Sequence, residues 1–144
     1  MPVVSPDGIV GQIVTASYEY AKVMLMTDRS SAIDALVQRN RARGIVEGET
    51  DETCLFKYVV RKAELEIGDV VVSSGLDGIF PKGLRIGAVS NISKVESSIF
   101  QEVKVTPFVD FGRLEEVLVI VEAKNDIESE TEPSEQELSA GEGN

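Results

Sequence analysis

Short apolar runs separated by turn-forming residues recur along residues 1–121. The segment 9–15 alternates in a way that predicts a strand with one buried face, whereas 23–26 is apolar at every position, as is typical of a strand buried on both faces. Further runs that predict strands lie at 45–46, 55–60, 70–72, 84–92, 103–105 and 114–121. About eight short strands joined by short loops predict an all-β fold of the sandwich or barrel type.

The segment 31–38 fits two structures equally well. It begins with Ser-x-x-Asp, which resembles a capping box, and its apolar residues include a set with helical spacing. Ile33, Ala35 and Val37 also alternate as they would in a strand, so helix and strand both remain open. A weak break in the pattern at 47–53 permits a division into two small lobes.

The 144 residues contain no histidine, no tryptophan and a single cysteine, Cys54. Catalysis that depends on imidazole is therefore excluded within this chain, as are haem attachment and zinc sites built from cysteine and histidine. We expect no cofactor and no metal, and Cys54 is predicted to be a buried or inert thiol. No run approaches the roughly 20 apolar residues of a membrane span, and the first residues lack the pattern of a signal peptide.

Charge is distributed unevenly along the chain, which carries a net charge of −11. Residues 122–144 hold eight acids and one base, a net charge of −7, which leaves 17 acids and 13 bases, or −4, for residues 1–121. The segment 122–144 has almost no large apolar side chains, so we predict a disordered acidic tail that serves solubility. The remaining body is only mildly acidic, and nucleic acid is not expected as a partner.

Ser73 and Ser74 are the residues that most invite a test for nucleophilic catalysis. The sequence contains neither Gly-x-Ser-x-Gly nor Ser-x-x-Lys, and it has no histidine to activate a serine. The loop that follows has the outer glycine spacing of a Walker loop, but Leu84 and Arg85 occupy the positions where lysine and serine or threonine are needed. We therefore predict a rigid structural loop in which Gly75, Gly78 and Gly83 permit positive φ and Pro81 fixes its own.

Two groups of residues are candidates for contact with a partner. Arg39, Arg41 and Arg43 would all lie on one face of an extended chain, either as a patch for an anion or partner or, as a plainer alternative, as a charged strand edge that prevents aggregation. Four phenylalanines lie in the tight loop or near the last strands, and any that are exposed would be plausible anchors: Phe80, Phe100, Phe108 and Phe111.

Three blocks of the chain, covering most of residues 8–121, resemble the periplasmic domain of MreC, the bacterial rod shape-determining protein. The first spans 25–48 and begins Leu-Met-Thr-Asp-x-x-Ser-Ala-Ile, and the third combines Val-x-Val-x-Pro at 103–107 with Leu-Glu-Glu-Val-Leu-Val at 114–119. The second, at 68–87, is the most specific, because it contains Ser-Gly-Leu-x-Gly-x-Phe-Pro-x-Gly. The motif residues that we carry over as architectural first and interfacial second are Gly75, Leu76, Gly78, Phe80, Pro81 and Gly83.

The resemblance implies an all-β pair of small barrel-like lobes of mostly antiparallel strands, arranged as in chymotrypsin but without an active site. We place the first lobe at 4–50 and the second at 51–121, allowing strands to cross between them, and the resemblance favours a strand at 31–38. It also implies an N-terminal transmembrane helix and a coiled coil, neither of which precedes Met1, so we expect a soluble piece of a longer protein.

The implied function is that of a non-enzymatic scaffold in the elongation complex, which inserts peptidoglycan and maintains rod cell shape. The implied partners are a class B transpeptidase penicillin-binding protein, MreD and, indirectly, MreB, together with self-association of the full-length protein. The implied location is periplasmic, with contact to the membrane only through the N-terminal helix, although a lone cysteine by itself indicates a reducing compartment. The alternatives are a generic β-barrel adaptor of an envelope complex and a degenerate serine–lysine enzyme.

Overall fold

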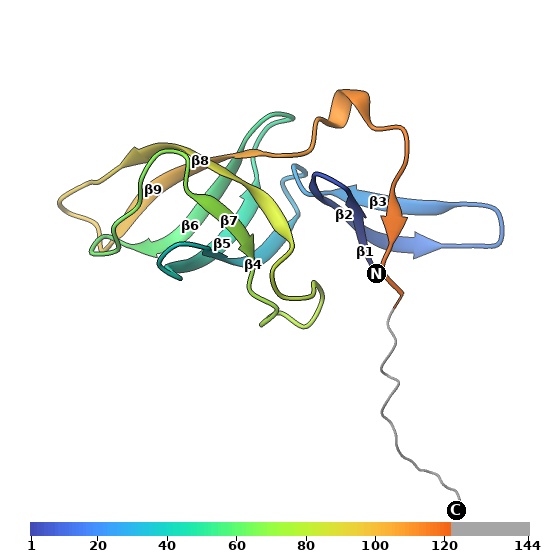
Figure 1. The fold of residues 1–144 in the computed structure, drawn as a ribbon, viewed down its shortest axis with the longest axis horizontal. Coiled ribbons are helices and arrows are strands. Elements are labelled where there is room, and N and C mark those ends of the chain that lie inside the picture. The colour runs from blue at the N-terminus through green and yellow to red at the C-terminus, as the bar shows by residue number, and fades with distance from the viewer. Residues whose placement is uncertain (122–144) are drawn as a thin grey trace, which may run out of the picture.

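The computed structural model describes residues 1–121, which form ten β-strands and one turn of 3₁₀ helix, with no α-helix among these residues (Figure 1). The elements in chain order are β1 Pro2–Ser5, β2 Gly8–Ala16, β3 Ala21–Leu25, β4 Ala32–Val37, β5 Arg43–Gly48, β6 Cys54–Val60, β7 Val70–Ser73, β8 Arg85–Ser93, β9 Phe100–Pro107, η1 Phe111–Arg113 and β10 Leu118–Val119. Within the described part of the chain no helix is long and apolar enough to cross a membrane. The predicted all-β class is confirmed.

Six strands close into a barrel in the order β4-β5-β6-β9-β8-β7, and every pair of neighbours is antiparallel. Alternate residues of each strand point inward, as in β9, where Gln101, Val103 and Val105 are buried between exposed neighbours. The interior is filled by apolar side chains, of which Phe56 is the largest fully buried one. A barrel of six strands is narrow enough to be packed solid, so its interior is a core and its hollows lie at the surface.

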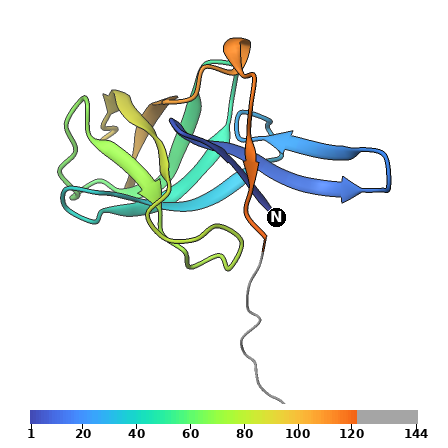
Figure 2. The same cartoon turned by 45° about the vertical axis from the view of Figure 1, so that its right-hand side comes forward.

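The other four strands form an open sheet in the order β10-β1-β2-β3. The β2–β3 hairpin extends away from the barrel, and the chain after β9 arches over to bring β10 beside β1 (Figures 1 and 2). A small second core of Val3, Val10 and Val109 holds this arch against the sheet, and Phe111 packs against both cores. The first and last described strands therefore pair with each other.

The two lobes differ from those drawn from the sequence. One is a closed barrel, but the other is an open sheet, and the division at residue 50 does not coincide with the boundary between them. β4 and β5 belong to the barrel because β4 pairs with β7, with Ala35 opposite Ser73 and Leu36 opposite Val72. The ambiguous segment 31–38 contains this strand, β4, and not a helix. The predicted tail, 122–144, lies outside the described residues.

Three strands were mispredicted for identifiable reasons. β3 was expected to be buried on both faces, but it forms an edge of the open sheet, and Val23 and Leu25 are partly exposed. Within the apolar run 114–121, only the two residues of β10 form a strand. The residues before β10 are part of the arch that passes over the sheet, so they pair with no strand. β1 was missed because it has four residues and begins at a proline.

Candidate binding surfaces

The β7–β8 loop, residues 74–84, carries the most specific sequence motif and has a rigid backbone. Gly75, Gly78 and Gly83 all have positive φ, at 81°, 74° and 90°, a region that other residues enter only with strain. The Asp77 carboxylate organises the loop: Oδ1 accepts hydrogen bonds from the backbone N–H groups of Ile79 and Phe80, and Oδ2 accepts one from Asp34 N of β4. The loop is therefore fastened to the barrel wall.

Both serines that were tested as nucleophiles are hydrogen-bonded within this loop. The hydroxyl of Ser73 donates to Pro81 O at 2.5 Å and accepts from Leu84 N at 2.9 Å. The hydroxyl of Ser74 donates to Asp34 Oδ1 at 3.0 Å and accepts from Leu76 N at 3.2 Å. Ser73 and Ser74 are buried, so these hydroxyls fix the loop and do not face solvent.

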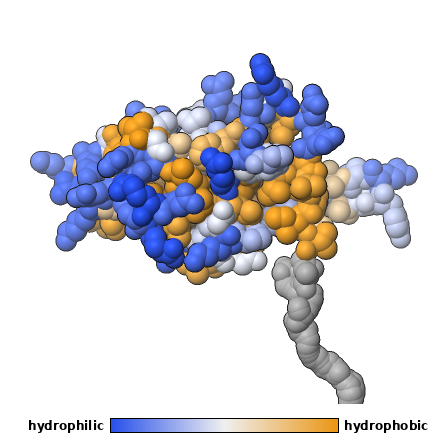
Figure 3. Space-filling view, in the orientation of Figure 1, coloured by the Kyte–Doolittle hydropathy of each residue, from blue (hydrophilic) through white to orange (hydrophobic). Residues whose placement is uncertain are grey.

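The side chains of the loop separate into an inner and an outer set. Phe80 is buried and joins the barrel core, which makes it an architectural residue, whereas Leu76 and Ile79 are exposed. Leu76 and Ile79 border a hollow of about 800 Å³ that is also lined by Pro2 of β1 and by Ile120, which follows β10. Apolar side chains gather on the face of the molecule over β1 and β10 (Figure 3).

The three arginines do not lie on one extended strand. Arg39 and Arg41 lie in the turn between β4 and β5, where Arg41 has φ of 63°, so the chain is not extended there and the geometric basis of the predicted patch is wrong. Arg43 is the first residue of β5, and its Nη2 lies 3.6 Å from Oδ1 of Asp34. Arg39 and Arg43 each form an ion pair among residues 1–121, whereas Arg41 forms none there.

Arg39 forms a two-pronged ion pair that links the β4–β5 turn to the segment before β7. Its Nε and Nη2 atoms donate to Oδ1 and Oδ2 of Asp69, each at 3.0 Å, and Nη2 also donates to Glu64 O. The hydrogen bond from Arg39 lowers the pKa of Asp69 below its usual value, and the same bond raises the pKa of Arg39. The Arg39 side chain therefore has a structural role in the fold.

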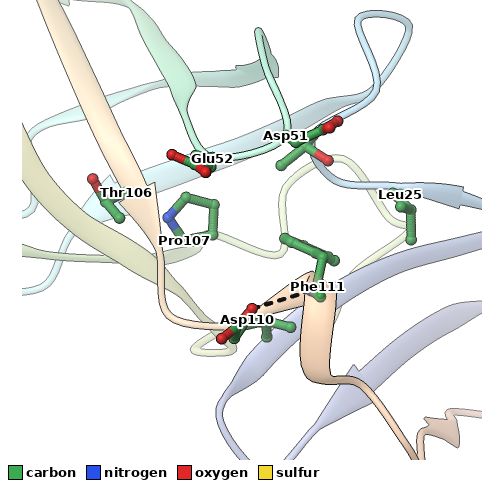
Figure 4. Close-up of a pocket in the computed structure, with 10 residues that line it drawn as sticks. Leu25, Asp51, Glu52, Thr106, Pro107, Asp110 and Phe111 are labelled. Carbon is green, nitrogen blue, oxygen red and sulfur yellow. Dashed lines mark hydrogen bonds between the residues drawn. The ribbon is translucent and has the colours of Figure 1, made fainter.

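The other three candidate phenylalanines are half-buried and lie in different places. Phe108 is covered by the guanidinium of Arg85, whose Cζ lies 4.1 Å from the ring centroid. Phe111 borders a hollow of about 690 Å³ between β3, the β5–β6 loop and the arch, with the Asp51, Glu52 and Asp110 carboxylates around it (Figure 4). Asp110 uses Oδ1 to cap the 3₁₀ turn, accepting from Gly112 N at 3.1 Å (Figure 4). The ring of Phe100 contacts the ring of Tyr58.

Another hollow, of about 400 Å³, lies along β9 between β6 and β8 and had not been recognised from the sequence. We call it the β9 groove; its lining includes Glu49, Leu55, Lys57, Tyr58, Phe100 and Gln101. The Tyr58 and Phe100 rings meet edge to face, with centroids 5.6 Å apart. The pattern of β6 gives a sign of this groove. The buried Phe56 and Val59 are three positions apart, which breaks the alternation of a strand and indicates a bulge.

These features define the class of the molecule: an all-β domain in which a closed, filled barrel carries a small open sheet and offers hollows at its surface. The family model described as rod shape-determining protein MreC, barrel core, matches residues 1–121. The chain belongs to this family, and the resemblance seen in the sequence is confirmed.

Individual relatives agree with the family match. The cell shape-determining protein MreC of Haemophilus influenzae is 36% identical over 128 residues, which cover 88% of this chain and 36% of that protein. MreC of Pseudomonas aeruginosa has a crystal structure that matches with a TM-score of 0.80 at 32% identity, covering 83% of this chain and 78% of the other. A structure of MreC from Helicobacter pylori in complex with penicillin-binding protein PBP2 matches with a TM-score of 0.63 at 26% identity, covering 75% and 68%. The chain spans about a third of the length of the curated relatives it matches.

Proposed function

We propose that this domain is part of a scaffold that determines cell shape, and that it acts by binding a class B transpeptidase penicillin-binding protein. The observation that carries the proposal is the structure of the H. pylori relative in complex with a penicillin-binding protein. The matching relatives are named cell shape-determining proteins, which fits a role in organising wall synthesis. The scaffold would belong to the complex that elongates the wall, together with MreD and, indirectly, MreB.

Binding without catalysis is consistent with the chemistry of the described residues. The two serines that could act as nucleophiles are buried and hydrogen-bonded. Within residues 1–121 no group of three or more acidic, cysteine or histidine side chains is placed to hold a metal ion. The surface instead offers hollows bordered by apolar side chains, which suit contact with another protein.

The proposed location follows from the proposed partner. A transpeptidase acts on peptidoglycan, which lies outside the inner membrane, so its scaffold would be periplasmic. Self-association of the full-length protein would place several copies of the domain side by side and raise the overall avidity.

The direct test is a calorimetric titration of this chain with the purified ectodomain of the transpeptidase, with serum albumin as an unrelated control. We expect saturable binding with a micromolar or weaker Kd, because a single copy lacks the avidity of an assembly. Absence of binding up to about millimolar concentration would contradict the proposal.

A further inference from the structure

The hollow of about 690 Å³ beside Phe111 lies where the two parts of the molecule meet, and we call it the arch hollow. Its lining comes from the end of β3 and the residues after it, the β5–β6 loop, the end of β9 and the arch (Figure 4). β3 belongs to the open sheet, whereas β9 belongs to the barrel. A segment bound in the arch hollow would therefore contact both parts of the domain at once.

The middle of the arch hollow is apolar. Leu25, at the end of β3, is 38% exposed, and Pro107 and Phe111 are half-buried. Figure 4 shows Pro107 and Phe111 between the carboxylates that surround the hollow. The volume lies within the roughly 300–1,000 Å³ of typical ligand pockets, and the exposed apolar surface favours contact with an apolar side chain.

The charged residues of the arch hollow all have the same sign. Asp51, Glu52 and Asp110 line it, and no lysine or arginine of the described residues does so. Asp51 and Glu52 form no ion pair among residues 1–121, and Asp110 pairs only with the exposed Arg113, at 3.7 Å between Oδ2 and Nε. Three carboxylates around one hollow create a negative potential that favours a cationic group.

The placement of these carboxylates suits an organic cation better than a metal ion. Within residues 1–121, no group of three or more acidic, cysteine or histidine side chains is placed to hold a metal. The three carboxylates surround the hollow and do not converge on one point (Figure 4). The guanidinium of arginine or the ammonium of lysine has several N–H donors on a long apolar stem, and it can reach such separated acceptors.

Thr27 adds a buried hydroxyl to the arch hollow. This residue lines the hollow and is 8% exposed, and its Oγ1 has no hydrogen-bond partner among residues 1–121. The side-chain oxygens that are sealed from solvent without a partner belong to Glu49 and Gln101, so Thr27 Oγ1 keeps access to the outside. A buried hydroxyl gains free energy when a donor or acceptor reaches it. The hydroxyl and the carboxylates therefore offer acceptors to the same ligand.

We propose that the arch hollow binds a segment of a partner protein that presents an arginine or lysine side chain beside an apolar one. The cationic group lies among the three carboxylates and donates to the Thr27 hydroxyl, while the apolar side chain packs on Leu25 and Phe111. The proposal rests on the proposed function, in that the partner is the transpeptidase, and it assigns the surface and the chemistry of the contact.

The charge is tested by the double variant Asp51→Asn, Glu52→Gln. Both residues are exposed and without ion pairs among residues 1–121, so we expect the melting temperature to stay within about 3 °C. We expect the Kd for the transpeptidase ectodomain to rise at least about tenfold and to depend less on salt.

The matched control is Glu115→Gln, Glu116→Gln, which changes a second pair of neighbouring, exposed acids outside the arch hollow. It alters the net charge by the same amount, so it removes any general effect of charge from the comparison. Equal loss of affinity in both double variants, or in neither, would overturn the proposal.

The hydroxyl is tested by Thr27→Val, which keeps the branched shape and removes the hydrogen-bonding group. We expect binding about threefold weaker than in the wild type, without a lower melting temperature, because the hydroxyl has no partner in the free domain. Thr27→Ser keeps the hydroxyl and should bind more tightly than Thr27→Val. A valine variant that binds as tightly as the wild type would contradict the hydrogen bond from the bound cation to Thr27.

A peptide probe separates failure of the arch hollow from failure of the proposed partner. A blocked tripeptide Leu-Arg-Leu is titrated into the chain and followed by NMR, with Leu-citrulline-Leu as a control of the same shape without the charge. The proposal predicts shifts for Leu25, Thr27 and Asp51 with the arginine peptide alone, even where the transpeptidase does not bind. Shifts elsewhere, or none up to about 10 mM, would reject the hollow.

Discussion

Asp69 joins the β4–β5 turn to the turn before β7 through one buried carboxylate. Its oxygens accept from Nε and Nη2 of Arg39, and Oδ2 also accepts from Glu66 N at 2.9 Å. Its backbone N–H donates to Glu66 O, so the turn before β7 is fixed from both sides. The charged form of this residue is favoured by the hydrogen bond from Arg39, which outweighs the opposing effect of burial.

Removal of this carboxylate is expected to destabilise the domain in a pH-dependent way. Because the pKa of Asp69 is lower in the folded state than the 3.8 usual for an aspartate, its contribution is present above about pH 4 and is lost as the pH falls through the folded pKa. Urea unfolding of Asp69→Asn should show a free energy of unfolding below that of the wild type near neutral pH, with a gap that narrows below about pH 4. A gap that stays constant down to about pH 2 would contradict this account.

At Gly83 the backbone conformation favours glycine over any other residue. Its φ of 90° is a region that side chains rarely adopt, although a Cβ at Gly83 would meet no atom within 4 Å. We expect Gly83→Val to lower the free energy of unfolding by about 1–3 kcal/mol through strain alone. Gly112→Ala is the control, because Gly112 is exposed and a Cβ there makes only an ordinary contact with Asp110. Equal denaturant midpoints for the two variants would contradict the explanation.

At the scale of the elements, the strands follow from the sequence and their partners do not. The apolar alternation located most of the strands, and the glycines of the β7–β8 loop predicted its positive φ angles. The pairing of β4 with β7, the edge position of β3 and the turn at Arg39 depend on contacts between distant segments, which local pattern does not encode. The site was the least predictable part, because the β9 groove arises from two bulges and a strained tyrosine.

β6 begins with a buried thiol, Cys54, whose reactivity shows whether the barrel stays closed around it. Burial, with a smaller contribution from the charge of Glu49, raises the pKa of Cys54 to about 12. We expect the native protein not to react with a disulfide reagent at about pH 8, and to react fully in denaturant. Above about pH 9 the thiol should also reduce stability, since the unfolded chain loses this proton before the folded one does. Rapid native labelling would show that β6 opens locally.

At the scale of the whole molecule, the closed barrel and the open sheet share contacts through Phe111, which packs against both cores, and through Ile9 of β2, which lies in the barrel core. Unfolding of the described domain is therefore expected to be a single transition. Within the open sheet, the first described strand, β1, pairs with the last, β10, so the integrity of the sheet depends on both.

Deletion of residues 125–144 is expected to leave this transition unchanged. The segment has nearly no large apolar side chains, so it has little to bury against the body. The free energy of unfolding of the shortened chain should lie within about 0.5 kcal/mol of that of the full chain. A melting temperature lower by many degrees would show that the tail supports the fold.

Hydrogen–deuterium exchange of this chain with and without the transpeptidase ectodomain tests most directly the claim that the domain is a binding scaffold. The account predicts slower exchange in the complex for a contiguous set of peptides on one face of the domain, and unchanged exchange at the tip of the β2–β3 hairpin. Exchange that is the same at every peptide under conditions where the transpeptidase is in saturating excess would contradict it.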